Sequence, residues 1–182
     1  MKKIGIPLSS AHRLLYPRNV VLVSCVDQND KSNFITLAWC TPTSFRPPMV
    51  AISVGHERYS HKLIEENKEF VVNIPTMEIL EDVLLCGRTT GKTGDKLKKT
   101  LLTPLPAKRV KPQIIKECVA HIECKLIQQI KTGDHTLFVG EAIAAYSNEG
   151  IFDGSFVLSE VNPIYQVEES EFATVSPETI RL

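Results

Sequence analysis

The 182-residue sequence has little that would mark a nucleic-acid-binding, membrane-spanning or secreted protein. Its 21 Lys and Arg residues balance 21 Asp and Glu residues, so no net charge draws it toward nucleic acid or anionic membranes. Aromatic residues make up only 7% of the chain. No apolar run is long enough to span a bilayer, and Pro7 interrupts the basic start, unlike in a signal peptide. We therefore expect a cytoplasmic protein with no membrane and no nucleic-acid partner.

Cysteine usage gives no sign of a disulfide framework, because the five cysteines are odd in number and widely spread. No C-x-x-C pair occurs, so the usual zinc and thioredoxin-like sites are not expected. Cys118, His121 and Cys124 lie close together, but in a strand the two cysteines share one face and the histidine takes the other. A metal site at this trio is the less favoured alternative. We favour buried cysteines in a reducing compartment and expect no metal.

Three catalytic signatures are also missing. Residues 87–93, GRTTGKT, resemble a P-loop, but the spacing is one residue short and position 86 is Cys. The stretch also follows a predicted helix rather than a strand, so its backbone donors would not converge on phosphates. Neither a G-x-S-x-G elbow nor a G-x-G-x-x-G fingerprint occurs. We interpret residues 87–93 as a polar loop, and we expect neither a nucleotide hydrolase, a serine hydrolase nor a Rossmann nicotinamide site.

Strand-forming segments, in contrast, are abundant. β-branched and apolar runs at residues 20–26 and 33–39 flank a polar turn and predict a hairpin. Residues 119–130 and 135–146 flank the turn at 131–134 and predict a second, longer hairpin. Two further strands are expected at residues 49–54 and 69–74, with the prolines around Phe45 interrupting any ladder between the first hairpin and the third strand.

Two helices are expected among these strands. Residues 59–68 combine an apolar face with charged positions, and residues 77–85 follow a natural cap, Thr76, and precede Gly87. The predicted order favours a mainly β fold, a closed or nearly closed antiparallel barrel with inserted helices. Length and a 43% hydrophobic content suit a single domain over residues 1–182, with a core at about 18–154. The polar tail, residues 163–182, is expected to wrap the surface or a partner subunit.

A specific resemblance begins at Thr36, where the sequence reads TLAWCTPTSFRPPMVAISV up to Val54. It continues through ERYS at 57–60, EFVVNIP at 69–75, CG at 86–87, TGK at 90–92, DKL at 95–97 and GDHTLFVGE at 133–141. The ordered set, over about residues 18–154, resembles the flavin reductase-like family, particularly its flavoredoxin branch. The resemblance implies an FMN-binding split barrel with antiparallel, Greek-key-type strands, and a homodimer with the flavin near its interface.

The resemblance also implies the cofactor-binding residues, and their chemistry suits FMN. The backbone at a strand end can meet the polar edge of the flavin ring, which points to Thr36, Leu37, Ala38 and Trp39. The neighbouring strand end, Ser53 and Val54, would lie under the ring or ribityl chain. Arg58 and Ser60 at a helix start offer a cation and a hydroxyl to the phosphate. Lys96 is a second candidate cation, and His135 is the candidate catalytic residue, as a donor of a hydrogen bond or proton.

Each of these residues has a simpler alternative that the sequence leaves open. Trp39 can be a core or interface aromatic, Arg58 can pair with Glu57 or Glu65, and Ser60 can cap its helix. Lys96 can form a solvated pair with its neighbour Asp95, and His135 can satisfy turn carbonyls. Cys40, next to Trp39, is either a redox-active thiol or, as we favour, a buried structural residue.

The predicted function is that of an FMN-binding redox protein of the flavoredoxin or flavin reductase type, which transfers electrons through bound FMN. One alternative is an NAD(P)H-dependent flavin reductase that releases reduced flavin. Another is a non-catalytic FMN-binding module. The electron donor is expected to be NAD(P)H or a redox protein.

Overall fold

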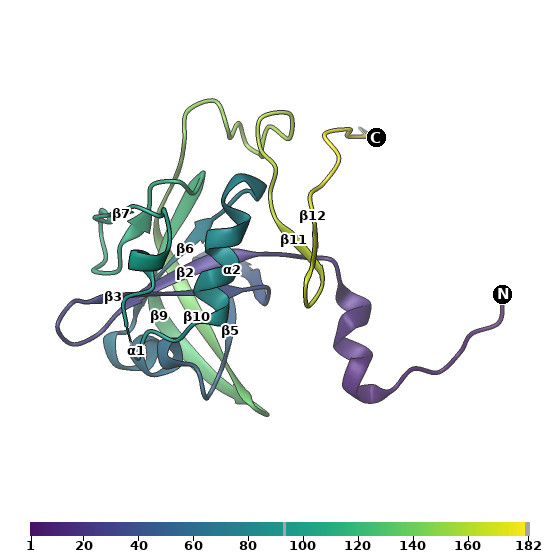
Figure 1. The fold of residues 1–182 in the computed structure, drawn as a ribbon, viewed down its shortest axis with the longest axis horizontal. Helices are drawn as coiled ribbons and strands as arrows, with labels where there is room; N and C mark the ends of the chain where they lie inside the picture. The colour runs from purple at the N-terminus through teal and green to yellow at the C-terminus, as the bar shows by residue number, and fades with distance from the viewer. Residues whose placement is uncertain (93, 181–182) are drawn as a thin grey trace.

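The computed structural model describes residues 1–92 and 94–180, and its main feature is a seven-stranded sheet (Figure 1). The strands follow one another across the sheet as β3 (Ser32–Leu37), β2 (Val21–Val26), β6 (Glu69–Ile74), β9 (Ala120–Thr132), β10 (His135–Ser147), β5 (Pro48–Gly55) and β4 (Cys40–Phe45). All neighbouring pairs are antiparallel. The mainly β class and both predicted hairpins, β2–β3 and β9–β10, are confirmed.

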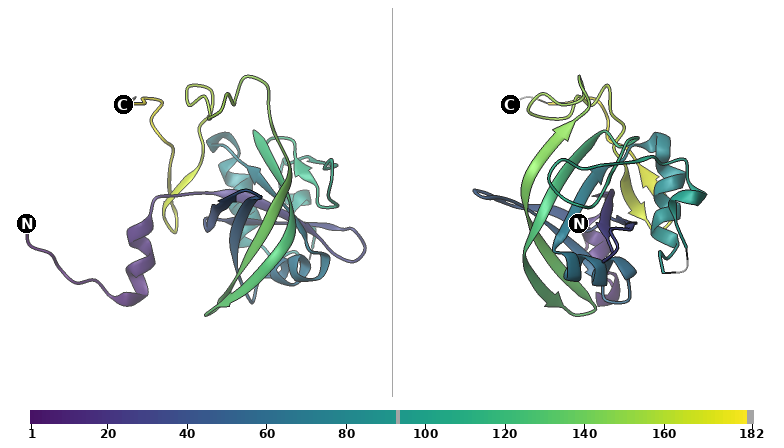
Figure 2. Two further views of the ribbon diagram at one scale, coloured as in Figure 1. Left: turned by 180° about the vertical axis from the view of Figure 1, so that it is seen from behind. Right: turned by 90° about the vertical axis from the view of Figure 1, so that its left-hand side faces the viewer.

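The sheet curls, and its two edge strands are consecutive in the chain, joined by Ala38 and Trp39 (Figure 2). The Ser53 amide donates a hydrogen bond to the Trp39 carbonyl over 2.9 Å and fastens this corner to β5. Within the described residues, β3 and β4 are not paired with each other. The barrel is therefore split between these two strands rather than closed.

β2 lies between two layers and is buried along its whole length. Val21 and Val23 face the inside of the curled sheet, where they pack with Phe70 and Phe138. Leu22 faces the opposite side and packs with residues of the helical layer. Fully burying a Val, Leu or Phe side chain contributes about 1.5–3 kcal/mol. A strand with both faces covered therefore shows a continuous apolar run instead of alternation.

The two helices cover opposite sides of this strand layer. α1 (Tyr59–Asn67) matches the prediction; it buries Leu63 and Ile64 in the core and ends at Lys68, which has a left-handed φ of 59°. α2 (Leu80–Arg88) starts later than predicted, after a short 3₁₀ helix η2 (Met77–Ile79). Gly87 lies inside α2, so its predicted position beyond the helix end was wrong.

The reason for Gly87 is close packing. A Cβ atom at this position would lie 3.1 Å from the Cβ atom of Thr36 in β3. The missing side chain lets the last turn of α2 approach the end of β3.

β4 is a strand that the sequence did not predict, because Pro42 within it and Pro47 and Pro48 after it indicated a break. The structure pairs Cys40 with Ile52 and Phe45 with Pro48. β4 is an edge strand with only one neighbour, so Pro42 does not have to donate to a second ladder.

The chain termini form a separate layer. The polar tail contributes β11 (Tyr165–Glu168) and β12 (Glu171–Ala173); β11 lies between β12 and β1 (Arg18–Asn19) and pairs with both. The 3₁₀ helix η1 (Leu8–Leu15) buries none of its residues and projects away from the large sheet (Figures 1 and 2). Thr93 of the P-loop-like stretch and the last two residues of the predicted tail lie outside the described residues.

The remaining elements are short. β7 (Pro104–Leu105) pairs with β8 (Ile114–Ile115), and η3 (Leu97–Lys99) is a short 3₁₀ helix. Among the described residues, no helix combines the length and apolar character that crossing a membrane requires.

Candidate functional site

A cleft lies where β3 ends, between the start of α1 and the end of α2. It consists of three adjoining cavities of about 220, 480 and 220 Å³. Arg58 and Gly87 line all three, so the cavities share one wall. Ligand-binding clefts typically measure about 300–1,000 Å³. The cleft therefore has room for a cofactor-sized molecule.

One end of the cleft is aromatic. The rings of Trp39 and His135 lie 4.8 Å apart between centroids and are tilted by 32°. His135 is opposite Gly55 in the β10–β5 register, which places it beside the corner that carries Trp39. Its Nδ1 atom lies 2.7 Å from the Asp134 carboxylate, and this hydrogen bond lowers the pKa of Asp134. The carboxylate orients the imidazole at this end of the cleft.

Arg58 lies immediately before α1 and lines all three cavities. Its Nε atom is 2.9 Å from Glu57 Oε1, and the two side chains are 55% and 69% exposed. An exposed ion pair of this kind contributes about 0–1 kcal/mol, so a stronger anion can displace Glu57. The N-terminus of α1 adds a favourable dipole for such an anion.

Two predicted phosphate-binding residues are buried and already hold the fold together. Ser60 is 2% exposed and accepts a hydrogen bond from Asn33 Nδ2 over 2.7 Å, which joins α1 to β3. The Lys96 ammonium donates to the carbonyls of Phe34 and Cys86, both over 2.7 Å. Burial lowers the pKa of Lys96. Lys96 therefore fastens the end of α2 to β3, although it also lines one cavity of the cleft.

The structure brings most of the predicted residues together. One cavity is lined by Thr36, Leu37, Ala38, Trp39, Ser53, Arg58 and His135. Val54 is fully buried and packs in the core, so its side chain does not face the cleft. Thr36 donates its hydroxyl hydrogen to the carbonyl of Val83 in α2, which further joins the two walls.

Other lining residues were missed. Gly87, Arg88, Tyr16 and Gln166 also line the cleft. Gly87 is part of the CG motif, so its position was detectable from the resemblance. Gln166 carried no signal, because its polar surroundings in the tail indicated only a surface segment.

The cysteines do not form a reactive centre in this cleft. All five are free, and burial raises the pKa of the Cys40 thiol to about 12. Cys40 packs against the core cluster, as a structural residue does. A thiol of this kind stays protonated near neutral pH and is a poor nucleophile. Among the described residues, no group of three His, Cys, Asp or Glu side chains is arranged to hold a metal ion.

The split antiparallel sheet and the cleft at its seam define a β-sheet protein with a cofactor-sized site beside a helix N-terminus. The chain belongs to the flavin reductase-like family, because residues 12–161 match the model of the flavin reductase like domain. An uncharacterized protein from Archaeoglobus fulgidus is 43% identical over 141 residues, covering 77% of this chain and 78% of the relative.

Two solved structures share the fold along the entire chain. The flavoredoxin of Desulfovibrio vulgaris (Miyazaki F) is 27% identical, with a TM-score of 0.87, and the match covers 100% of this chain and 96% of that one. The flavoredoxin of Methanosarcina acetivorans is also 27% identical, with a TM-score of 0.87 and coverage of 100% and 95%. The predicted family and its flavoredoxin branch are confirmed.

Proposed function

We propose that this protein binds FMN in the cleft and transfers electrons through it. The observation that carries the proposal is the shared wall of the three cavities, where Arg58 faces the cleft from the N-terminus of α1. A flat ring system, a polar chain and a phosphate need an aromatic end, hydroxyl and backbone groups, and a cation. One cavity of the cleft offers all three kinds of group, with Trp39, Thr36 and Arg58 in its lining. The two flavoredoxin neighbours support FMN as the cofactor.

In this proposal, the chain positions the cofactor and the bound FMN supplies the redox chemistry. The segment from Thr36 to Trp39 meets the ring edge where β3 leaves the ladder. Arg58 exchanges Glu57 for the phosphate. His135, held by Asp134, donates a hydrogen bond or a proton at the ring end. Lys96 contributes mainly by holding the cleft walls in place.

The direct test is a spectrum of the purified protein followed by titration of the flavin-free chain with FMN. Replacing Arg58 by Ala removes a charge-assisted contact of about 1.5–3 kcal/mol, which weakens FMN binding about 10- to 150-fold. Arg109→Ala is the matched control, because Arg109 is exposed and lines none of the three cavities. Equal FMN affinity in the Arg58 and Arg109 variants would refute the phosphate role. A protein that no added FMN colours would refute the proposal as a whole.

A specific observation favours a second candidate, the NAD(P)H-dependent flavin reductase. The largest of the three cavities, of about 480 Å³, is lined by residues of α2 and of the β11–β12 hairpin but not by Trp39 or His135. It offers room for a second molecule beside the flavin. Anaerobic bleaching of the flavin colour by NADH or NADPH supports the reductase. Bleaching only by a reduced redox protein supports the flavoredoxin-type carrier. If neither reductant bleaches the flavin colour, the result supports the non-catalytic FMN-binding module.

We also propose that the protein is a homodimer. Phe45 at the tip of the β4–β5 hairpin is 96% exposed, and Leu8, Leu14 and Leu15 of η1 are 65–90% exposed. A second copy is the natural cover for such apolar surface. Light scattering with size-exclusion chromatography measures the mass directly, and the variant Phe45→Ser should shift it toward the monomer. A monomeric mass for the wild type at micromolar concentration would contradict this proposal.

A further inference from the structure

Two histidines on either side of Arg58 in the chain converge on one buried hydroxyl. His56 follows β5, His61 lies in the first turn of α1, and Thr136 lies in β10. The Nε2 atoms of His56 and His61 lie 3.1 and 2.8 Å from Thr136 Oγ1, and the two ring centroids are 5.3 Å apart. Thr136 is 2% exposed, whereas His56 is exposed and His61 is half-buried. This histidine cluster therefore has a buried centre and reaches solvent through its rings.

The hydrogen bonds of the histidine cluster leave one ring nitrogen able to take a proton. A hydroxyl group donates one hydrogen and accepts through two lone pairs, whereas a neutral imidazole has one N–H group and one bare nitrogen. With both rings neutral, Thr136 satisfies the two contacts by donating to one Nε2 atom and accepting from the other. A proton added to the accepting Nε2 atom makes that ring a second donor, and the Thr136 oxygen can accept from both. The cluster can thus gain one positive charge and keep both contacts.

Charged groups on several elements face the two histidines: Glu57, Glu65, Lys131 and Asp134. Burial has the largest influence and lowers the pKa of His61 from its ordinary value of 6.5. The two glutamates oppose this shift, whereas His56 and Lys131 add to it. His61 is therefore mostly neutral at pH 7, and additional negative charge nearby would favour its protonated form.

The turn between the two histidines holds Arg58 and its partner Glu57. The Arg58 amide donates to the carbonyl of Gly55, and its carbonyl accepts from the His61 amide, both over 3.0 Å. A Cβ atom at Gly55 would lie 2.7 Å from Glu57 Oε2, so the carboxylate folds back over this glycine, which precedes His56. Glu57 also lines a cavity of the cleft together with Arg58. A phosphate that takes Arg58 therefore meets the charge of Glu57, and this carboxylate then needs another cation.

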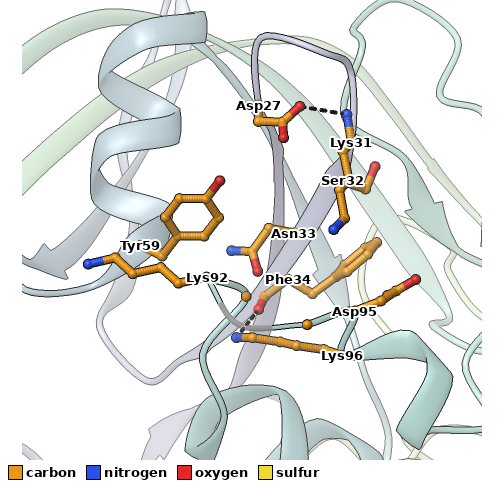
Figure 3. Close-up of a pocket in the computed structure, with 11 residues that line it drawn as sticks. Asp27, Lys31, Ser32, Asn33, Phe34, Tyr59, Lys92, Asp95 and Lys96 are labelled. Atoms are coloured by element: carbon orange, nitrogen blue, oxygen red, sulfur yellow. Dashed lines mark hydrogen bonds between the residues drawn. The ribbon is translucent and has the colours of Figure 1, made fainter.

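Lys96 is not free to become that cation. It lines the same cavity, but its ammonium donates to the carbonyls of Phe34 and Cys86 over 2.7 Å, and the bond to Phe34 is drawn in Figure 3. These bonds hold the lysine against β3 and α2. The histidine cluster, in contrast, is joined to the turn that carries Glu57 and can gain a charge without losing a contact. It is the better candidate to balance the carboxylate.

We propose that His61, supported by Thr136 and His56, takes up a proton when the FMN phosphate binds at Arg58, so that FMN affinity rises as the pH falls from about 8 to about 6. The inference rests on the proposed function, because it begins with a phosphate at Arg58. The proton comes from the solvent and is held at Nε2 of His61. His61 is thus a positioning residue, which acts through Glu57 rather than on the flavin itself.

Calorimetry of the flavin-free chain measures this proton. FMN binding is recorded from about pH 6 to about pH 8 in buffers of different ionisation enthalpy, and the difference in heat gives the number of protons taken up. At its maximum, uptake by the wild type should exceed that of His61→Gln by about 0.3–0.5 proton. The FMN affinity of the wild type should correspondingly rise about threefold to tenfold more across this range. Comparing two proteins cancels the titration of the phosphate itself, which occurs near pH 6.

Three controls separate the charge from the structure. Riboflavin, which lacks the phosphate, should bind to the wild type without this proton uptake. Thr136→Val keeps both histidines but removes the oxygen that accepts from the protonated ring, so it should reduce the uptake on FMN binding. His12→Gln removes a histidine that lies beside Trp39 instead, with 6.0 Å between ring centroids, and should leave the uptake unchanged.

The outcomes separate this inference from the proposed function. FMN binding with equal proton uptake in the wild type and His61→Gln would overturn the inference alone. A loss of affinity in His61→Gln that is the same at every pH would also overturn it, because the histidine would then act only as a structural residue. Uptake with riboflavin as large as with FMN would exclude the link to the phosphate. Failure of the wild type to bind FMN at any pH would refute the proposed function and, with it, this inference.

Discussion

The buried histidine of β9 makes the stability of this protein depend on pH. His121 is 5% exposed and lies opposite Asn73 of β6. Its Nδ1 atom is 2.8 Å from Asn73 Oδ1, an oxygen that also accepts from the Ile115 amide. Because Asn73 accepts, His121 donates from Nδ1, and its neutral form carries the proton there. Protonating the second nitrogen would place a charge in the core.

Burial lowers the pKa of His121 from 6.5 to about 4, although nearby Glu123 opposes this shift. The unfolded chain therefore binds more protons than the folded chain between these two values. The contribution of neutral His121 to the free energy of unfolding is therefore fully present above pH 6.5. It decreases as the pH falls through this window and is lost below about pH 4. A difference of 2.5 pKa units at 1.36 kcal/mol each corresponds to about 3 kcal/mol.

Urea denaturation between pH 7.5 and pH 4.5 measures this effect when the wild type is compared with His121→Gln. The variant cannot titrate at this position, so the gap in unfolding free energy between the two proteins should change by up to about 3 kcal/mol across the window. The His12→Gln variant is the control, since His12 is exposed. Parallel pH profiles for the wild type and His121→Gln would refute the reasoning, whatever the offset between them.

Two further predictions concern packing and a buried carboxylate. Gly140→Ala should cost about 1–3 kcal/mol of unfolding free energy, because the new Cβ atom would lie 2.6 Å from the buried ring of Phe70. Gly5→Ala is the control, since nothing lies near its Cβ position, and a Gly140→Ala effect as small as that of the control would contradict the prediction. Glu123 is fully buried and accepts hydrogen bonds from the amides of residues 108–110 over 2.6–3.2 Å. Glu123→Ala leaves these donors without a partner, so it should cost about 3–5 kcal/mol and expose this loop to trypsin; unchanged cleavage there would argue against the anchoring role.

Much of the fold was predictable because it rests on local patterns. The apolar run of β2 reflects burial on both faces, and the β9–β10 hairpin turns at Gly133, which has a φ of 63°. The cleft residues from Thr36 to Trp39, with Arg58 and His135, were found through the ordered motifs. These motifs lie in strand ends and turns, where the backbone needs particular residues.

The failures have a common physical cause. The sequence shows that Pro42 cannot donate to a ladder, but not that β4 has only one neighbour and does not need the donor. It shows Gly87 near a helix end, but not that α2 packs so closely on β3 that a Cβ atom at Gly87 would lie 3.1 Å from the Thr36 Cβ atom. Both facts depend on an element distant in the sequence.

The sequence by itself determined the mainly β class, the family and most of the predicted residues around the cleft, because these follow from strand patterns and motif order. Only the tertiary structure decided which polar groups are free to meet a ligand. Lys96 reaches Phe34, 62 residues away, and Ser60 is bound by Asn33, so both serve the scaffold first. Arg58 is held only by an exposed ion pair with Glu57, since burial and hydrogen bonding are satisfied by whichever partner the fold brings near.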